Sequence, residues 1–227
     1  MKLNEGITNT ARGFAQIREI FKDRSVHSSE SGLLLCGDCL ELMRELPDGC
    51  VDAVVTDPPY GIGFRNNQWD SQIPLWLDEA KRISTCVIFT TAPLTQWDYP
   101  KPDWVGCFYR DAACSRSLLG GFNHWTPIMV YGKPDVKVDS IKLHAIANAQ
   151  PHNYPHPSPK PINLMLFLVG WTPSNAIILD PFLGSGTTAV AALRTGRQFI
   201  GMEISPEYCA IAQKRVDYEL SQTRLAL

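Results

Sequence analysis

The sequence predicts a doubly wound α/β fold with a mostly parallel sheet, because short apolar runs alternate with helical stretches along the chain. Each apolar run is followed by a turn signal or a polar residue, as expected of strands buried on both faces. The predicted strands are 33–36, 51–56, 86–91, 176–179 and 198–204, and the predicted helices are 40–46, 74–82, 162–169, 187–194 and 206–220. Such a sheet binds ligands beyond the carboxyl ends of its strands.

Two further runs, 104–110 and 126–131, flank a glycine-containing loop and predict an antiparallel hairpin at one edge, which brings the sheet to seven strands. Residues 1–31 are polar with one helical pattern around Phe14, Ile17, Ile20 and Phe21, and we expect a mobile N-terminal extension or a partner-binding helix there. Residues 32–227 form the predicted main domain, with an insertion at about 108–155.

Composition indicates a soluble globular protein of the cytoplasm. The chain has 227 residues, of which 44% are hydrophobic and 19% charged, and its formal net charge is -2. The longest apolar run, 162–171, is interrupted and far shorter than the roughly 20 residues of a membrane span. The N-terminus has no signal-peptide pattern. The charge argues against a large non-specific footprint on nucleic acid, without excluding a local one.

The cysteines and histidines predict no metal site. Seven cysteines in apolar stretches favour reduced, buried thiols. Cys36 and Cys39 form a CxxC pair, for which a redox role stays open as the less favoured alternative, but no second pair at zinc-ligand spacing follows. The histidines also lack the spacing of one helix face; they are His124, His144, His152 and His156.

The stretch "IILDPFLGSGTTAVAALRTGRQFIGME", 177–203, has the features of a cofactor site. One strand ends in Asp180, a turn carries Gly184 and Gly186, and the next strand ends in Glu203. Glycines let a ligand approach the backbone, and a strand-end carboxylate can accept hydrogen bonds from ribose hydroxyls. The turn is neither GxGxxG nor a P-loop, and Asp180 would repel a pyrophosphate. We therefore expect a cationic, adenosine-containing cofactor, S-adenosylmethionine; a turn used only for packing is the alternative.

"VVTDPPYGIG", 54–63, holds an aspartate rigidly at a strand end. Pro58 and Pro59 fix φ and so fix the backbone beside Asp57. An ordinary Asp-Pro turn, with Tyr60 as a half-buried ring, is the bland alternative.

"DPPYGIG" and "DPFLGSGTT", in this order, resemble the catalytic and cofactor motifs of the β group of DNA amino-methyltransferases. "LLLCGDCLELMRELPDGCVDAVVTDPPY" is similar to the strand, Gly-Asp turn, helix and catalytic strand of that family, and "HPSPKP" at 156–161 to the element before its cofactor strand. The resemblance implies a Rossmann-like methyltransferase fold. It also implies methyl transfer from S-adenosylmethionine to adenine N6 in double-stranded DNA, after the base is flipped out of the duplex. A homodimer and a bacterial or phage host are further expectations; whether a cognate restriction nuclease exists stays open.

The resemblance also assigns roles to residues. Asp57 and the carbonyl of Pro58 would accept the amine hydrogens, Pro59 would hold them in place and Tyr60 would stack on the base. Asp38 would lie near the adenine ring of the cofactor, and Glu203 would bind its ribose. The methionine part would be held by Pro157, Ser158, Lys160, Asp180, Phe182, Gly184, Ser185, Gly186 and Thr187.

Several alternatives remain at this point. Aspartate at the first motif position favours adenine, whereas cytosine-N4 enzymes more often have serine there. An RNA or protein methyltransferase, a non-catalytic nucleic-acid module and, most weakly, a dehydrogenase are the others. The predicted hairpin and the polar stretch after it mix cations with aromatic rings, which suits phosphate contact and base stacking; they are Phe108, Tyr109, Arg110, Arg116, Phe122, Trp125, Lys133, Lys137 and Lys142. Interspersed aspartates leave a plain solvated surface as the alternative.

Overall fold

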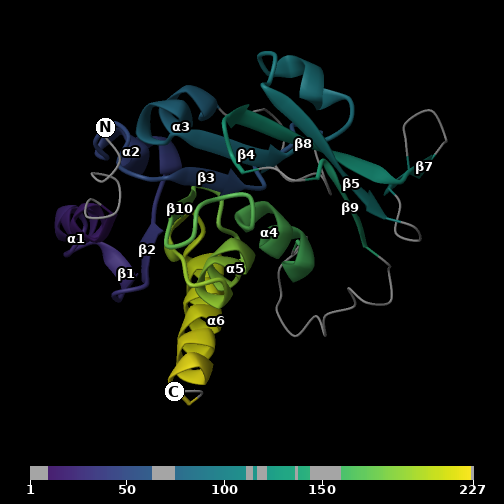
Figure 1. The fold of residues 1–227 in the computed structure, drawn as a ribbon. Coiled ribbons are helices and arrows are strands. Elements are labelled where there is room, and N and C mark those ends of the chain that lie inside the picture. Colours follow the sequence, from purple (N-terminus) through teal and green to yellow (C-terminus); the bar gives the residue numbers. More distant parts are fainter. Residues whose placement is uncertain are drawn as a thin grey trace, which may run out of the picture.

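A computed structural model describes residues 10–62, 75–110, 115–116, 122–135, 138–143 and 160–225. In these ranges the chain forms a nine-stranded sheet in the order β1-β2-β11-β10-β3-β4-β8-β5-β9, with helices on both faces (Figure 1). Its strands are β1 (Ser25–Ser28), β2 (Gly32–Cys36), β3 (Ala53–Thr56), β4 (Cys86–Thr90), β5 (Trp104–Arg110), β8 (Trp125–Gly132), β9 (Ser140–Leu143), β10 (Ile177–Asp180) and β11 (Gln198–Glu203).

The five central strands, β2, β11, β10, β3 and β4, are parallel. The predicted hairpin is present as β5 and β8, which pair antiparallel, and β8 also pairs antiparallel with β4. The hairpin does not form the edge, because β9 pairs with the outer side of β5, and β1 closes the other edge against β2. A separate two-stranded sheet joins β6 (Ser115–Arg116) and β7 (Phe122–Asn123). The structure thus confirms the doubly wound sheet and adds two edge strands to the seven predicted.

Alternate residues of the buried strands point to opposite faces and build two hydrophobic cores. Leu33 and Leu35 face one core, whereas Leu34 faces the other, as period-two alternation requires. One face is covered by α1 (Thr10–Ile20), α2 (Cys39–Arg44) and α3 (Leu77–Ile83), and the other by α4 (Ile162–Val169), α5 (Thr187–Arg194) and α6 (Pro206–Leu225). Figure 1 shows α2 and α3 on one side of the sheet and α4 and α5 on the other. No helix in the described part of the chain is long and apolar enough to cross a membrane.

The N-terminal segment is part of the packed fold from residue 10 onward, which differs from the expected extension. Phe14, Ile17 and Phe21 are almost completely buried in the core beneath α1. Strand β1 pairs with β2, and Nδ1 of His27 lies 3.0 Å from Oδ1 of Asp217 in α6. The helical pattern around Phe14 and Ile17 is real, but its apolar side faces the sheet.

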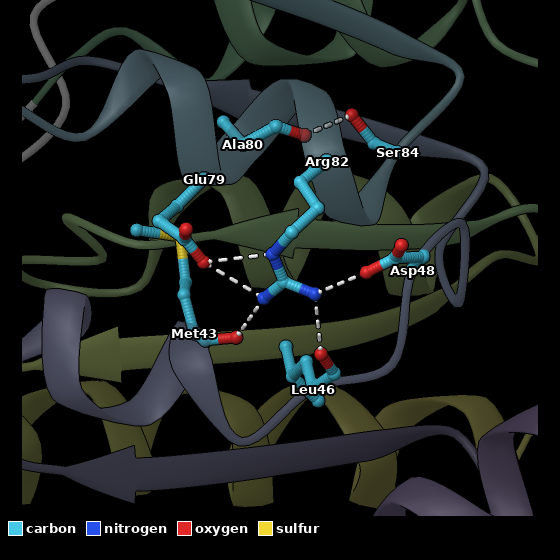
Figure 2. A network of polar contacts seen from close by, with 7 residues as sticks. All are labelled: Met43, Leu46, Asp48, Glu79, Ala80, Arg82 and Ser84. Carbon is cyan, nitrogen blue, oxygen red and sulfur yellow. Dashed lines mark hydrogen bonds and ion pairs between the residues drawn. The ribbon is translucent and has the colours of Figure 1, made fainter.

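Arg82 ties α2 and α3 together at the end of the sheet where the strands begin (Figure 2). Its guanidinium donates to the carbonyls of Met43, in the last turn of α2, and Leu46, just beyond that helix, at 2.8 and 2.9 Å. It also pairs with Glu79 at 2.7 Å and Asp48 at 2.6 Å. Because α2 precedes β3 and α3 precedes β4 in the chain, this network helps to fix two strands whose opposite ends carry the candidate site.

Candidate active site

Adjacent parallel strands bring the motifs of both halves of the chain to one edge of the sheet. Asp57 follows β3, Asp180 ends the neighbouring strand β10, and Glu203 ends β11 beside it. Register confirms the closeness, since Leu179 pairs with Val54 and Asp180 pairs with Gly201. Thr56 links the two motifs directly, because its hydroxyl donates to Oδ1 of Asp180 at 2.6 Å. Residues more than 120 positions apart therefore form one polar edge.

The Asp57 carboxylate lies at the centre of a compact polar cluster. The hydroxyl of Tyr60 donates to Oδ1 at 2.7 Å, and the hydroxyl of Thr90, at the end of β4, donates to the same oxygen. Pro58 is buried and Pro59 is half-buried, so the backbone on which Asp57 sits is enclosed. Burial, followed by the nearby charge of Asp57, raises the pKa of Tyr60 well above its usual value. Tyr60 therefore stays a neutral phenol that can donate to the carboxylate.

Lys160 contacts the other oxygen of the same carboxylate. Its ammonium nitrogen lies 2.6 Å from Oδ2 of Asp57 and 4.9 Å from the centre of the Tyr60 ring. Its motif predicts this lysine at the methionine end of the cofactor. The structure places it on Asp57 instead. Pro157 and Ser158, expected in the same element, lie outside the described residues.

Asp180 is a buried carboxyl group with only 3% of its surface exposed. Burial raises its pKa to about 6, and the charge of Asp57 acts in the same direction. Hydroxyl groups of Thr188 and Thr56 and the N–H of Phe182 act in the opposite direction by hydrogen bonding. A carboxyl group buried beside another carboxylate is stabilised by a cationic ligand.

Glu203 organises the glycine turn that follows β10. Its carboxylate accepts hydrogen bonds from the backbone N–H groups of Gly184 and Ser205, both at 2.8 Å. Burial raises the pKa of Glu203, and these N–H groups oppose the shift. Each carboxylate oxygen has two lone pairs, so the group keeps acceptor capacity for a ligand hydroxyl.

The turn before α5 is held by glycine geometry and by a buried arginine. Gly186 has φ of 85°, and a Cβ there would lie 3.2 Å from Ala212 of α6. Arg215 donates to the carbonyl and hydroxyl of Ser185, at 2.7 and 2.9 Å, and to the hydroxyl of Thr187 at 3.2 Å. The ring of Phe182 packs edge-on against Trp76 with centroids 5.6 Å apart. The residues predicted in this turn, from Phe182 to Thr187, therefore lie together between the end of β10 and the start of α5.

Asp38 lies beyond β2, the strand next to β11, and is exposed. It caps α2, because its Oδ1 accepts from the N–H groups of Leu40 and Glu41 at 2.8 and 3.3 Å. These capping bonds use Oδ1 only. The N–H of Gly37, the residue before Asp38, donates to the carbonyl of Glu203 at 2.9 Å, so Asp38 lies at the same edge as Glu203.

Cations and aromatic rings gather where β5 ends and β8 begins, at the edge that also carries Asp57. Tyr109 pairs with Trp125 across the two strands, and its ring stacks on that of His124 with centroids 6.1 Å apart. The ammonium nitrogen of Lys142 lies 5.7 Å from the centre of the Tyr109 ring. Arg110 follows Tyr109, and its Nε is buried without a hydrogen-bond partner among the described residues. Its charge acts on Tyr60. Of the other cations predicted here, Lys137 and the side chain of Arg116 are outside the described part, and Lys133 is exposed.

Three residues at the site were not predicted from the sequence: Thr56, Thr90 and Arg215. Both threonines end apolar strands, and a polar residue at a strand end is the same signal that identified Asp57 and Asp180. Arg215 carried no such signal, since a single arginine in a long, mixed helix resembles any solvated one. Within the described ranges, no cluster of three or more possible metal ligands is present.

Comparison with known proteins agrees with this geometry. A family model described as DNA methylase, of the N6 and N4 type, matches residues 97–214. The YubD protein of Escherichia coli (strain K12) is 30% identical over 200 residues, which cover 79% of this chain and 88% of YubD. Type II methyltransferase M.HpaI of Haemophilus parainfluenzae is 23% identical over 83% of this chain and 75% of its own length.

Two solved structures show the same fold. The complex of M1.HpyAVI with S-adenosylmethionine superposes with a TM-score of 0.63 at 22% identity, covering 81% of this chain and 99% of that protein. The cytosine-N4-specific PvuII DNA methyltransferase superposes with a TM-score of 0.67 at 15% identity, covering 85% and 88%. The family match over more than half of the chain and the likeness to YubD place this protein in the family of N6-adenine and N4-cytosine DNA methyltransferases.

Proposed function

We propose that this protein transfers a methyl group from S-adenosylmethionine to the exocyclic N6 amine of adenine in double-stranded DNA. Transfer to an amino group of a DNA base, with S-adenosylmethionine as methyl donor, is the activity of its family. Adenine is the finer step, and it rests on the aspartate at position 57, where adenine-modifying members of the family typically carry one. The observation that carries the proposal is the carboxylate of Asp57 at the strand end next to Asp180.

The proposed chemistry uses Asp57 as a hydrogen-bond acceptor. The lone pair of an exocyclic amine is delocalised into the ring, so the amine is a poor nucleophile. Asp57 and the Pro58 carbonyl would accept its two hydrogens and favour a tetrahedral nitrogen whose lone pair faces the methyl group. S-adenosylmethionine, when bound, would supply the methyl group: as the nitrogen–carbon bond forms and the carbon–sulfur bond breaks, the sulfonium would become a neutral thioether. The methylated nitrogen would then pass one proton to solvent.

Cofactor binding is assigned to the edge formed by β2, β11 and β10. The sulfonium and ammonium of S-adenosylmethionine suit Asp180, whose charge is costly while it is buried without a cation. Glu203 would accept from the ribose, Asp38 would lie beside the adenine ring, and the turn with Gly184 and Gly186 would approach the methionine part.

DNA is assigned to the aromatic and basic group at the end of β5, within the insertion predicted at about 108–155. Tyr109 and Trp125 are 39% and 38% exposed, so both can stack on bases. Arg110 and Lys142 supply positive charge for phosphates on the same edge. A flipped adenine would lie between this group and Asp57. A homodimer, proposed from the family alone, is tested by sedimentation of the purified protein.

The decisive experiment follows labelled methyl from S-adenosylmethionine into a mixed-sequence DNA duplex, with digestion to nucleosides and mass analysis. Wild-type protein is expected to give N6-methyldeoxyadenosine. Asp57→Ala should give none while still binding the cofactor in calorimetry. Asp98→Ala, which removes one exposed carboxylate of the 3-10 helix Thr95–Asp98, serves as the matched control and should remain active.

The products separate the alternatives. Formation of N4-methyldeoxycytidine would show that the target base is cytosine rather than adenine, and the rest of the proposal would stand. Methyl transfer to RNA or protein, but not to DNA, would refute it. Cofactor binding without transfer to any of the three would favour a non-catalytic module.

A further inference from the structure

The two oxygens of the Asp57 carboxylate have different surroundings. Oδ1 accepts from two hydroxyl groups, those of Tyr60 and Thr90. Oδ2 accepts from the ammonium of Lys160 at 2.6 Å. One oxygen is therefore held by the fold itself, and the other by a long, flexible side chain.

Thr90 is placed for this contact by the sheet. Thr56 pairs with Phe89, so the residues that follow them, Asp57 and Thr90, leave two adjacent strands at the same level. Thr90 is completely buried, and its hydroxyl lies 3.2 Å from the hydroxyl of Tyr60 as well. Oδ1 of Asp57 and the hydroxyl oxygens of Tyr60 and Thr90 are all within hydrogen-bonding distance of one another. The Tyr60 hydroxyl is nearer to Asp57 than to Thr90. The single hydroxyl hydrogen of Thr90 goes to Asp57, and its lone pairs face Tyr60.

We propose that Thr90 is a positioning residue, which turns the Asp57 carboxylate so that Oδ2 receives the substrate amine. This inference rests on the proposed function. With two donors on Oδ1, Oδ2 is the oxygen with room for another N–H group. Lys160 marks that place, because its ammonium stands in for an amine nitrogen. It donates to Oδ2 and lies 4.9 Å from the centre of the Tyr60 ring.

Removing the Thr90 hydroxyl would act on the rate rather than on binding. A hydrogen bond to a charged group contributes enough that its loss corresponds to a ten- to hundredfold change. Without it, the carboxylate is held at Oδ1 by Tyr60 alone and can rotate away from the orientation that the amine requires. Misorientation of an acceptor lowers the turnover of bound substrate, whereas neither the cofactor edge nor the proposed DNA surface changes.

The test compares Thr90→Val, Thr90→Ser and Thr91→Val in methyl transfer to duplex DNA. Valine keeps the shape of threonine and lacks the hydroxyl, and serine restores it. Thr91 provides the matched control, because it is also completely buried but its hydroxyl contacts Thr95 at 3.1 Å instead of Asp57. Thermal unfolding of each variant, together with KM for DNA and for S-adenosylmethionine, separates a change of rate from a change of folding.

The expected result is a ten- to hundredfold lower kcat for Thr90→Val with both KM values within about threefold of wild type. Thr90→Ser should recover most of the rate, and Thr91→Val should match wild type. An active wild type with an equally fast Thr90→Val overturns this inference alone, as does a Thr90→Ser variant no faster than Thr90→Val. A wild type that methylates no DNA overturns the proposed function, and this inference with it.

Discussion

The ammonium of Lys160 lies 2.6 Å from Oδ2 of Asp57, so a residue expected at the cofactor meets the proposed catalytic carboxylate. Both side chains are about one-fifth exposed, which distinguishes this pair from the solvated ion pairs elsewhere on the surface. Lys160 lies two residues before the start of α4 and precedes its N-cap residue, Pro161. In the proposed reaction, the substrate amine takes the position on Oδ2 that the lysine ammonium holds. The pair would then separate before methyl transfer, and the cofactor carboxylate would offer the lysine a second partner.

Replacement of Lys160 by glutamine is expected to weaken S-adenosylhomocysteine binding by about tenfold or more, because a hydrogen bond between two charged groups is lost. S-adenosylhomocysteine keeps the methionine-type carboxylate but lacks the sulfonium, so the measurement isolates this contact. Calorimetry with Lys160→Gln and the exposed control Lys133→Gln makes the comparison. Equal affinity of Lys160→Gln and wild type would remove Lys160 from the cofactor site.

A crystal structure with bound ligand would test the same displacement of Lys160. In a crystal of the protein with S-adenosylhomocysteine, we expect the Lys160 ammonium to lie more than about 4 Å from Oδ2 of Asp57, the distance limit of an ion pair. A pair that stays closed with the cofactor bound would mean that DNA itself displaces the lysine.

The raised pKa of Asp180 predicts that the contribution of this group to the stability of the fold falls as pH rises. Its pKa in the folded protein is about 6, above the usual 3.8, so the folded state binds the proton more tightly than the unfolded state. Stability contributed by this group is present at low pH and is lost as pH rises from about 4 through 6. Asp180→Asn removes the titration. The free energy of unfolding of Asp180→Asn, relative to that of wild type, should therefore be higher at pH 7.5 than at pH 4.5 by about 2 kcal/mol, from roughly 1.4 kcal/mol per pKa unit.

Urea unfolding of the ligand-free proteins at these two values of pH measures the difference, and using the change between them cancels any constant cost of the asparagine. An equal difference at both values would contradict a buried, raised Asp180. The same variant is expected to bind S-adenosylmethionine at least tenfold more weakly at pH 7.5, because a cation loses its carboxylate.

Much of the fold could be predicted because its signals are local. The helix 162–169 and the helix 187–194 have the predicted bounds, and each predicted strand overlaps an observed one. Apolar strands between turn residues depend on neighbouring sequence alone. Strands β1 and β9 were missed because they lie at the edges, where polar residues replace the continuous apolar run of a buried strand.

The candidate site was predictable to the extent that each residue ends a strand. Asp57, Asp180 and Glu203 follow apolar runs, and parallel strands bring such ends to one edge. The partners of these residues depend on strand order, which the sequence does not show. Thr90 meets Asp57 because β4 lies beside β3, and Lys160 reaches Asp57 from the opposite half of the chain. Arg215 supports the glycine turn from a helix about 30 residues away.

Arg82 should affect stability without affecting the reaction, because its network lies where the strands begin, away from the candidate site. Arg82→Met keeps the aliphatic stem and removes the bonds to the carbonyls of Met43 and Leu46. With solvent screening of its ion pairs, the loss is expected to be about 1–2 kcal/mol. Chemical denaturation measures it, and Arg44→Met, an exposed arginine at the end of α2, should cost less than about 0.5 kcal/mol. A large fall in kcat for folded Arg82→Met would show that the network reaches the site.

Gly186 and Gly196 allow backbone strain to be separated from cofactor contact. Both have positive φ, 85° and 70°, where a side chain costs about 1–2 kcal/mol. A Cβ at Gly186 would also press on Ala212, whereas one at Gly196 would meet nothing within 4 Å. Both alanine variants are therefore expected to lose stability, with Gly186→Ala losing more.

Only Gly186→Ala is expected to weaken S-adenosylmethionine as well, by about tenfold or more, since the turn that Ser185 and Thr187 share with Arg215 would have to shift. Calorimetry at a temperature where both variants are folded makes the comparison, because residual instability then does not alter the measured affinity. Equal weakening in both variants would assign the effect to general loosening of α5, whereas unchanged affinity in Gly186→Ala would place the cofactor away from this turn.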